Sequence, residues 1–524
     1  MRHEVRRPGR SMQVVLATAW LCGCAGSAGT PPATTPATVA PAASTAQPSA
    51  PVADPWAGRK DLLTAPPPPK PAALELPKLE RFSLPNGLQV LVVARKDLPI
   101  ASFGIAVRAG GYDERRDRLG VADFVAAMLR RGTKTRSADD ISRAIDFVGG
   151  TLDAQASNES TFASCSVLSR DTALCLDLLS DILLRPSFPE AEMPEVRDQM
   201  LAAIASRYDN PHALASIHFD NQLFGEDHPD GWVLTPEDVR KITRADLEAF
   251  WRTYLRPNRA TLAIAGDVDV ARVRAEVSKA FGGWARATVP FRPVWKLPPL
   301  DATRVLLVDR ADLTQATMTL GHRGIEHADP RWYAATLMNY VLGGSDFSSR
   351  LMTEVRAKRG LTYGIGSSFG ASQYPGAFRV VASTKTETTG EALRTTIDEL
   401  RRMKATGPSA LELDKAKGYY AGSTPFSLQS ASGIASALVT AELHGLGDAY
   451  VRELPLRLAD KDVNAVKAAA RELLYPDALE VVIVGKADAI GPQLAKAGLR
   501  FERIGFKDPI HRARNPERVP NLPR

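Results

Sequence analysis

Cysteine is scarce in this chain: there are four in 524 residues, and only Cys165 and Cys175 lie beyond residue 24. Their spacing does not match the paired cysteines of a zinc knuckle, which excludes a structural zinc site of that kind. The two lie in a strand-like and then a helical stretch, where buried thiols are the expected state. A disulfide between them is possible in an oxidising compartment, but a fold of this size does not require one.

Two functional signatures are also missing. The sequence has no convincing nucleophile–base signature, which argues against an autonomous peptidase with its own nucleophile. The net charge of +7 is spread over scattered Arg and Lys, without a basic helix interleaved with aromatics, so nucleic-acid binding has little support. With 44% apolar and 24% charged residues, the chain is typical of a soluble protein with large cores.

The N-terminus carries a basic stretch and then a short apolar run over residues 13–21, which is too short to cross a bilayer as a helix. The run ends in Leu21-Cys22-Gly23-Cys24, which resembles a bacterial lipoprotein signal. We expect Cys24 to carry the lipid, with an ordinary cleaved signal ending near Ala28 as the alternative. Ala25 favours sorting to the outer membrane of a Gram-negative cell. The predicted location is therefore periplasmic, with membrane contact only through the lipid anchor.

Residues 25–75 are dominated by Ala, Pro, Thr and Ser, and they have few large apolar side chains. Such a composition cannot bury enough surface to fold, so we expect a disordered tether between the signal peptide (1–24) and the folded part.

Residues 120–133 read Gly-Val-Ala-Asp-Phe-Val-Ala-Ala-Met-Leu-Arg-Arg-Gly-Thr. Alone, the segment is also typical of an ordinary amphipathic helix capped at Gly132. It follows two apolar-alternating runs around the turn Pro85-Asn86-Gly87, which predict a strand pair. In this order the segments resemble the insulinase/pitrilysin (M16) family of zinc metallopeptidases, whose inverted zinc motif reads His-x-x-Glu-His.

The resemblance implies that the zinc site has been lost. Asp123, Ala126 and Ala127 stand where the family has its first His, its Glu and its second His. The third ligand, a Glu on a later helix, should fall within residues 197–204, and we place its degenerate counterpart at Ala203, since no acid occurs from Gln199 onwards in this stretch. Zinc needs three or four N, S or O ligands, so we expect no metal to be bound by this chain.

His322-Arg-Gly-Ile-Glu-His327 has the composition of a second metal motif. Its two histidines are five residues apart, which places them on different faces of a helix. The preceding residues read as a strand that runs into a Gly-containing loop. We therefore expect His322 and His327 to be surface or loop residues.

The chain repeats itself. Residues 257–266 begin with Pro, end with Gly and enclose an apolar strand, and residues 476–485 have the same pattern. Two homologous α+β domains are the simplest account, at 76–288 and 302–508, with a Pro-rich linker at 289–301 and a basic tail at 509–524. The resemblance implies that each domain is an antiparallel-rich sheet backed by helices and that the two face each other across a chamber.

Residues 342–364 of the second domain match the C-terminal signature of the family, in which a Gly loop precedes an Arg and a Tyr that hold the substrate peptide. The matching residues here are Arg356 and Tyr363. Both side chains can donate hydrogen bonds to a peptide carbonyl or to the oxyanion formed from it. The alternative for Arg356 is a charge on the surface of a helix. Gly343 and Gly344 either allow close approach of a peptide or end the preceding helix.

Arg350, Lys358 and Arg359 lie near Arg356 in the sequence, and we assign them to solvent or to structural ion pairs.

Some members of the family have two chains, one with the zinc helix and one with a degenerate copy. The resemblance therefore implies a non-catalytic subunit that binds unfolded peptides and supplies Arg356 and Tyr363 to a partner subunit with an intact His-x-x-Glu-His and its zinc. Alone, the chain should not hydrolyse peptides. The alternative is a non-enzymatic scaffold or binding lipoprotein, in which Arg356 and Tyr363 would be dispensable.

Overall fold

The computed structural model describes residues 58–59 and 70–511. The predicted signal peptide with Cys24, nearly all of the predicted tether and most of the predicted basic tail lie outside the described residues. Residues 70–511 belong to one compact unit. Among the residues that the structure describes, no helix is both long and apolar enough to cross a membrane.

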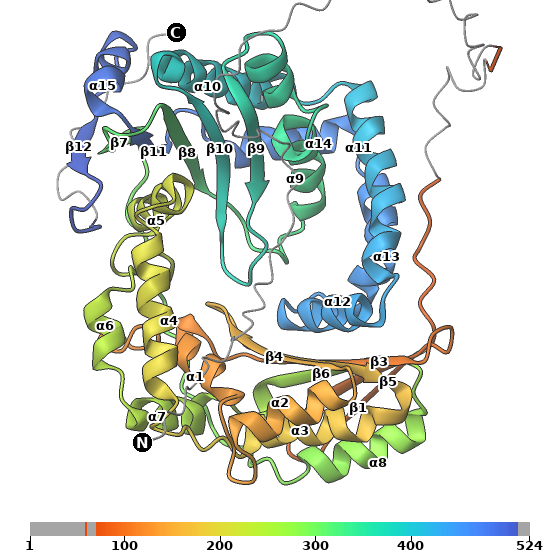
Figure 1. Ribbon diagram of the computed structural model, residues 1–524. Helices are drawn as coiled ribbons and strands as arrows, with labels where there is room; N and C mark the ends of the chain where they lie inside the picture. Colours follow the sequence, from red (N-terminus) through yellow and green to blue (C-terminus); the bar gives the residue numbers. More distant parts are fainter. Residues whose placement is uncertain (1–57, 60–69, 512–524) are drawn as a thin grey trace, which may run out of the picture. The chain divides into compact units, whose positions relative to one another are not determined.

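The first half of the fold is a six-stranded sheet in the order β1-β2-β6-β3-β5-β4 (Figure 1). The predicted strand pair is confirmed, because β1 and β2 form an antiparallel hairpin around the Pro85-Asn86-Gly87 turn. The strands are β1 (Leu79–Ser83), β2 (Gln89–Ala94), β3 (Ile100–Val107), β4 (Thr151–Ala156), β5 (Thr161–Leu168) and β6 (Ala260–Gly266). The helices are α1 (Val121–Leu129), α2 (Ala138–Phe147), α3 (Thr172–Leu184), α4 (Met193–Ser206), α5 (Pro211–Phe224), α6 (Pro236–Lys241), α7 (Arg244–Tyr254) and α8 (Val270–Phe281).

The second half is another six-stranded sheet, in the order β12-β7-β11-β8-β10-β9. Its strands are β7 (Arg304–Asp309), β8 (Gln315–Arg323), β9 (Thr362–Phe369), β10 (Ala377–Lys385), β11 (Glu480–Gly485) and β12 (Glu502–Gly505). Its helices are α9 (Trp332–Asn339), α10 (Thr389–Thr406), α11 (Ala410–Ser423), α12 (Ala431–Leu443), α13 (Gly447–Ala459), α14 (Val463–Leu473) and α15 (Ala487–Lys496), with single π-helical turns at η6 (Tyr340–Gly344) and η7 (Met352–Ala357).

The two sheets have the same internal topology. β6 and β11, which come from the two repeated segments, each lie third in their sheet and pair in parallel with β2 and β7. Each also pairs antiparallel with the next strand, β3 or β8. The sheets differ in the strand that lies outside this shared part. In the first sheet it is β1, from the start of the first half, and in the second sheet it is β12, from the end of the second half. The predicted α+β fold of two homologous halves, each a sheet backed by helices, is confirmed.

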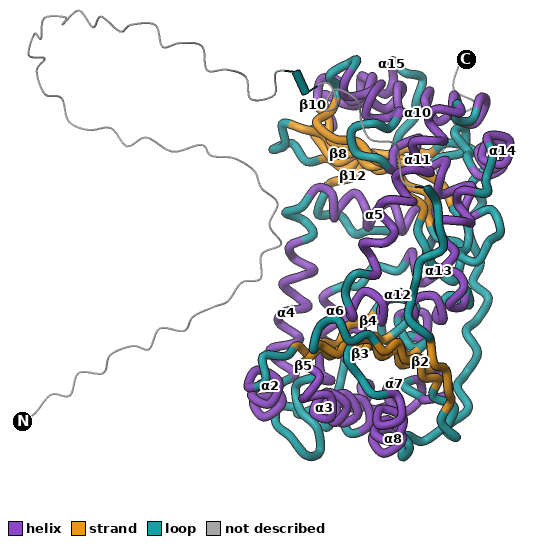
Figure 2. The backbone as a smooth tube through the Cα atoms, turned by 90° about the vertical axis from the view of Figure 1, so that its right-hand side faces the viewer, coloured by secondary structure: helices purple, strands orange, loops and turns teal. Residues whose placement is uncertain are grey.

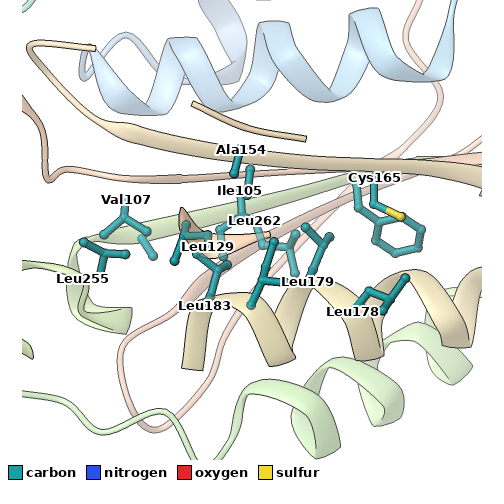
Figure 3. Close-up of a cluster of buried hydrophobic side chains, with 14 of the residues drawn as sticks. Ile105, Val107, Leu129, Ala154, Cys165, Leu178, Leu179, Leu183, Leu255 and Leu262 are labelled. Carbon is teal, nitrogen blue, oxygen red and sulfur yellow. The ribbon is translucent and has the colours of Figure 1, made fainter. Parts of the chain in front are cut away.

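The first core lies between its sheet and α3. Strand β3 is buried from its second residue onwards, as expected for a strand covered on both faces. Figure 3 shows Leu178, Leu179 and Leu183 of α3 pointing toward sheet residues such as Ile105 and Leu262.

The same core contains a disulfide between Cys165 on β5 and Cys175 on α3. Of the two states that the sequence left open, free thiols and a disulfide, the structure has the disulfide, and both side chains are buried as expected. The sheet and the helix pack face to face, which brings the two residues together across the core. The bond ties β5 to the helix that follows it.

The two halves exchange one helix each. Helix α12, from the second half, packs on β3 and β6 of the first sheet, and it buries Ile434 and Leu438 against Leu91 (Figures 1 and 2). Helix α5, from the first half, packs on β8 and β11 of the second sheet, where Phe219 lies against Val482. Each sheet therefore has one face covered by helices of its own half and part of the other face covered by a helix of the opposite half.

The segment predicted as the linker, residues 289–301, contains no helix or strand, although the structure describes all of it. It is fixed to the first half by Arg292, which donates a 2.7 Å hydrogen bond to the buried carboxylate of Asp113. Arg259 pairs with the same carboxylate at 3.2 Å. Further along, Trp295 packs among the rings of Tyr112 and Tyr374. The connection is thus anchored to both halves.

Candidate functional site

Helix α1 carries the degenerate zinc motif, and its first turn is held by a half-buried carboxylate. Gly120, with a φ of 82°, is the residue that precedes the helix. Glu114 accepts hydrogen bonds from the backbone N–H groups of Gly120 (3.0 Å) and Ala122 (2.7 Å). Burial raises the pKa of Glu114 to about 8, although these two hydrogen bonds oppose the change. Glu114 therefore serves the helix terminus, where backbone donors would otherwise lack partners.

Asp123 faces a pocket of about 310 Å³ that Glu114, Asn158 and Trp232 also line. The side chain is open to this pocket, yet the surrounding protein raises its pKa, and the nearby Arg207 guanidinium only partly offsets that effect. One helical turn further on, Ala126 is buried and Ala127 is half-buried.

The fourth predicted position, Ala203, lies in the exposed part of α4, a helix that packs on α1.

These residues do not fit a zinc ion. Of the four positions that correspond to the zinc ligands and the catalytic base, only Asp123 offers a donor atom, and the nearby Glu114 carboxylate already accepts two backbone hydrogen bonds. Zinc requires at least three protein ligands of the right type. Within the described part of the chain, no cluster of three or more His, Cys, Asp or Glu side chains could hold a metal ion.

Sequence reasoning missed several polar residues at and next to this pocket. Asp230 accepts hydrogen bonds from the Tyr112 hydroxyl (3.0 Å) and from the Asn158 amide (2.7 Å). Arg207, beside Asp123, donates to the backbone oxygen of Leu234 at 2.9 Å. These residues come from distant segments and match no motif, so only the tertiary structure identifies them.

Arg356 and Tyr363 lie together in the second half, on η7 and at the start of β9. The Cζ atom of Arg356 is 4.9 Å from the centre of the Tyr363 ring and 5.1 Å from the centre of the Phe347 ring. The guanidinium group therefore contacts two aromatic rings, and such cation–π contacts hold it without using its N–H donors. Tyr363 is 82% exposed and Phe347 is 77% exposed.

The guanidinium of Arg356 has no hydrogen-bond acceptor or carboxylate partner among the described residues. Its neighbours differ, as predicted: Arg350 pairs with Glu412 at 2.7 Å, Lys358 with Glu354 at 2.8 Å, and Arg359 with Glu391 at 3.6 Å. Arg356 is thus the one basic side chain of this motif that remains available to a ligand.

Gly343 and Gly344 form the end of the π-helical turn η6. Gly343 is buried, and a Cβ atom built on it would lie 2.5 Å from the hydroxyl oxygen of Ser367 on β9. A Cβ atom on Gly344 would lie 2.7 Å from the amide nitrogen of Asn339. The missing side chains let this turn pack against β9 and α9, next to the loop that carries Phe347.

The expectation that His322 and His327 are surface or loop residues was wrong for His322, which is buried on a strand, whereas His327 lies in the loop after β8, as expected, although its side chain is also buried. His322 lies on β8, stacks on Phe378 and donates from Nδ1 to the backbone oxygen of Arg323 at 2.8 Å. Burial lowers its pKa to about 4. Strand β8 continues through His322, and the packing around the sheet buries this polar side chain.

His327 belongs to a hydrogen-bonded chain that joins the two halves. Its Nε2 atom is 2.8 Å from the Tyr450 hydroxyl, and its Nδ1 atom is 2.7 Å from Nδ1 of His444. His444 in turn lies 3.0 Å from the carboxylate of Glu159, in the loop between β4 and β5. Burial, followed by the neighbouring His444, lowers the pKa of His327 to about 4.

Two family models match the chain. Residues 89–228 match the insulinase (peptidase family M16) model, and residues 241–420 match the peptidase M16 inactive domain. An uncharacterized zinc protease of Mycobacterium tuberculosis is 34% identical, over 78% of this chain and 93% of the relative. An uncharacterized zinc protease of Streptomyces coelicolor is 31% identical, over 76% of this chain and 87% of the relative.

Solved structures agree with this assignment. A peptidase M16 inactive domain from Pseudomonas fluorescens has a TM-score of 0.73 and 27% identity, and the match covers 78% of this chain and 98% of the other. A protease from Helicobacter pylori shares the fold, with a TM-score of 0.73 at 22% identity over 78% of this chain and all of the other (100%). With the degenerate helix α1 and the retained Arg356 motif, these matches establish that the chain belongs to the insulinase-type M16 peptidase family.

Proposed function

We propose that this chain is the non-catalytic, peptide-binding subunit of an M16 peptidase heterodimer and that it supplies Arg356 and Tyr363 to a partner subunit that carries the zinc. The observation that carries the proposal is the state of Arg356. Its guanidinium is held by two rings and has no acceptor among the described residues, whereas the three basic neighbours are all paired. An oriented side chain with five free donors is suited to a peptide carbonyl or carboxylate.

The degenerate helix supports the assignment of the chemistry to a partner. Ala126 and Ala127 provide no base and no ligand, so helix α1 lacks the groups with which a zinc peptidase activates water. The relatives bear the name of zinc proteases, which makes an intact family member the natural candidate for the partner. In such a pair this chain would orient the peptide, and a well-placed binding group can contribute substantially to the rate.

We further propose that the chain works in the periplasm, anchored by a lipid on Cys24. The buried disulfide between Cys165 and Cys175 supports export, since such bonds persist mainly in oxidising compartments. The anchor and the tether belong to the part of the chain that the structure does not describe, so this part of the proposal rests on the sequence.

The test uses the mature chain with Cys24 replaced by Ser, alone and mixed with an M16 subunit that has an intact His-x-x-Glu-His. We expect bound zinc and hydrolysis of unstructured peptides only in the mixture. Arg356→Ala should lower kcat/KM by roughly 10- to 100-fold, because a hydrogen bond to a charged group contributes about 1.5–3 kcal/mol. Lys358→Ala is the matched control, since it removes only an exposed ion pair with Glu354.

Two results would contradict the proposal. Zinc-dependent hydrolysis by this chain alone would show that it has its own active centre. A stable complex in which Arg356→Ala and Tyr363→Phe both retain full activity would instead favour the scaffold or binding lipoprotein.

A further inference from the structure

Aromatic side chains lie beside Arg356 and along η6 and α11 in the second half. We define the aromatic stripe as Phe347, Tyr363, Tyr340, Tyr419 and Tyr420. Three of its rings are largely open to solvent: Tyr363 is 82% exposed, Phe347 is 77% exposed and Tyr419 is 52% exposed. The members come from η6 and the loop after it, from β9 and from α11.

The stripe consists of two groups of rings, which are joined through η6 and the loop that follows it. At one end, Arg356 lies between the rings of Phe347 and Tyr363. The loop that carries Phe347 starts directly from η6, since the N–H of Ser345 donates to the backbone oxygen of Tyr340 at 3.2 Å. At the other end, the Tyr340 ring lies 4.7 Å from the Tyr419 ring, centre to centre.

Tyr420 completes this end of the stripe, at 5.4 Å from Tyr419 and 5.7 Å from Tyr340. Burial raises the pKa of Tyr420 to about 12, with the neighbouring Tyr419 and Tyr340 acting in the same direction. The Tyr420 phenol therefore stays protonated and uncharged in neutral solution, and the rings at this end present apolar faces with hydroxyl donors at the edges.

The aromatic stripe lies beside a positive charge that no described carboxylate neutralises. The guanidinium of Arg356 contacts no carboxylate among the described residues. Asp346, which precedes Phe347, is exposed and forms no ion pair with it in the described part of the chain. A surface with exposed Tyr, Phe and one uncompensated Arg has the composition of a binding site, because these residues give large contact areas and directional hydrogen bonds.

We infer that the aromatic stripe binds an extended peptide segment in which an acidic residue lies next to aromatic or large aliphatic residues. The acidic group pairs with Arg356, where the fork of N–H donors matches a carboxylate. The neighbouring apolar side chains lie on Phe347 and toward Tyr419. This inference rests on the proposed function, and it specifies the substrate class for the same site.

The test measures the binding of three short peptides to the soluble mature chain, with Cys24 replaced by Ser, by isothermal titration calorimetry at 0.15 M salt. The first has a Phe-Glu-Phe centre in a Gly/Ser background, the second has Gln in place of Glu, and the third has Ala in place of both Phe residues. We expect the first peptide to bind at least tenfold more tightly than either of the others. Arg356→Gln should remove the preference for Glu over Gln.

Phe347→Ala and Tyr419→Ala should each weaken binding of the first peptide by roughly 2- to 13-fold, the range expected for the loss of one ring contact. Phe347→Leu should keep part of the affinity, because a large apolar side chain remains. Phe147→Ala is the control: Phe147 ends α2 in the first half, is 91% exposed and lies outside the stripe. All the substituted rings of the stripe are exposed, so the variants should melt like the wild type.

Each other outcome is decisive. If Arg356→Gln weakens peptide binding but Phe347→Ala and Tyr419→Ala do not, the inference falls while the proposed function stands. If the two aromatic variants fail to assemble with the zinc-bearing subunit yet bind peptide normally, the stripe is a subunit interface and the inference is wrong. If neither the chain nor its complex binds any of the peptides, the proposed function falls together with it.

Discussion

At the scale of single residues, the second half keeps one cation free while it pairs the others. Arg356 touches only rings, and Arg350, by contrast, donates to Glu412 and to the backbone oxygen of Gly407. A paired guanidinium has already used its donors within the fold. A stacked one has already lost much of its rotational freedom but keeps its donors, which is the arrangement that reduces the entropic cost of binding.

Gly343 shows how closely that arrangement depends on packing. Gly343→Ala should destabilise the protein by about 1–3 kcal/mol, because a Cβ atom there would lie 2.5 Å from Ser367 Oγ and 2.8 Å from the Ser367 backbone nitrogen. Urea unfolding measures the change. Gly364→Ala on β9 is the control, since nothing lies within 4 Å of the added atom. Equal stability of the two variants would show that Gly343 is not required for packing.

At the scale of elements, buried bonds fix strands, helices and loops to one another. The chain from Tyr450 through His327 and His444 to Glu159 joins α13, two loops and the end of α12. Every group has a partner when both imidazoles are neutral. Tyr450 then donates to His327, His327 donates to His444, and His444 donates to the Glu159 carboxylate. Only one proton can lie between the two Nδ1 atoms, so a doubly charged pair does not fit.

Stability should therefore fall in mild acid. The pKa of His327 is about 4 in the fold and 6.5 ordinarily, so the unfolded chain binds the extra proton more readily between these values. The stabilisation is complete above about pH 6.5 and is lost as the pH falls toward 4. His218 and His322, also with pKa values lowered to about 4 by burial, act in the same direction.

Urea unfolding at several pH values checks this. In His327→Gln the free energy of unfolding should change less steeply with pH between 6.5 and 4. The slope should decrease by at most the contribution of one proton, which is about 1.4 kcal/mol per pH unit. Tyr450→Phe should destabilise the protein at neutral pH but keep the pH dependence, because it removes a hydrogen-bond donor and not the titrating ring. If the pH dependence of the unfolding free energy were unchanged in His327→Gln, the loss of stability in acid would not be due to His327.

The disulfide is the covalent counterpart of these contacts. It closes a short loop, with a sequence separation of 10, between β5 and α3. Reduction should lower the free energy of unfolding by roughly 2–4 kcal/mol, because the reduced chain gains conformational freedom when unfolded. Calorimetry with and without reductant measures this. The Cys165→Ala/Cys175→Ala double variant should show no effect of reductant.

At the scale of the whole molecule, the exchange of α5 and α12 makes the two halves depend on each other. Removal of α12 would expose Leu91, Val93 and Ala106 of the first sheet, and removal of α5 would expose Val482 and Val484 of the second. Neither half can bury its sheet alone. The repeat is therefore a repeat of sequence and topology, while the unit of stability spans both halves.

We expect one cooperative unfolding transition. Leu438→Ala, on the buried face of α12, should destabilise the protein by about 2–5 kcal/mol and lower hydrogen-exchange protection in both β3 and β10. Leu411→Ala, at a position that is 66% exposed on α11, should change little. Loss of protection in β3 alone would mean that the first half unfolds independently.

Much of this architecture follows from the sequence because it is encoded locally. Apolar alternation and the Pro-Asn-Gly turn indicate the first hairpin, and the repeated Pro-to-Gly segments indicate two equivalent strands. The residues at 123, 126 and 127 replace two zinc-ligand histidines and the catalytic Glu, whatever their surroundings are. The position of Arg356 in a family signature likewise needs no coordinates. The spacing of residues along the chain is enough to predict a structure or a site wherever it depends on residues that are close in the sequence.

What only the tertiary structure decided depends on segments that are distant in the sequence. The burial of His322 and His327, the bond between Cys165 and Cys175, the helix exchange and the free state of Arg356 all result from packing between such segments. The sequence around a histidine does not show whether a distant element covers its side chain. Nor does the sequence around a basic residue show whether a carboxylate lies close enough to pair with it. Local patterns determine the elements, whereas long-range packing determines which side chains are buried, paired or left available.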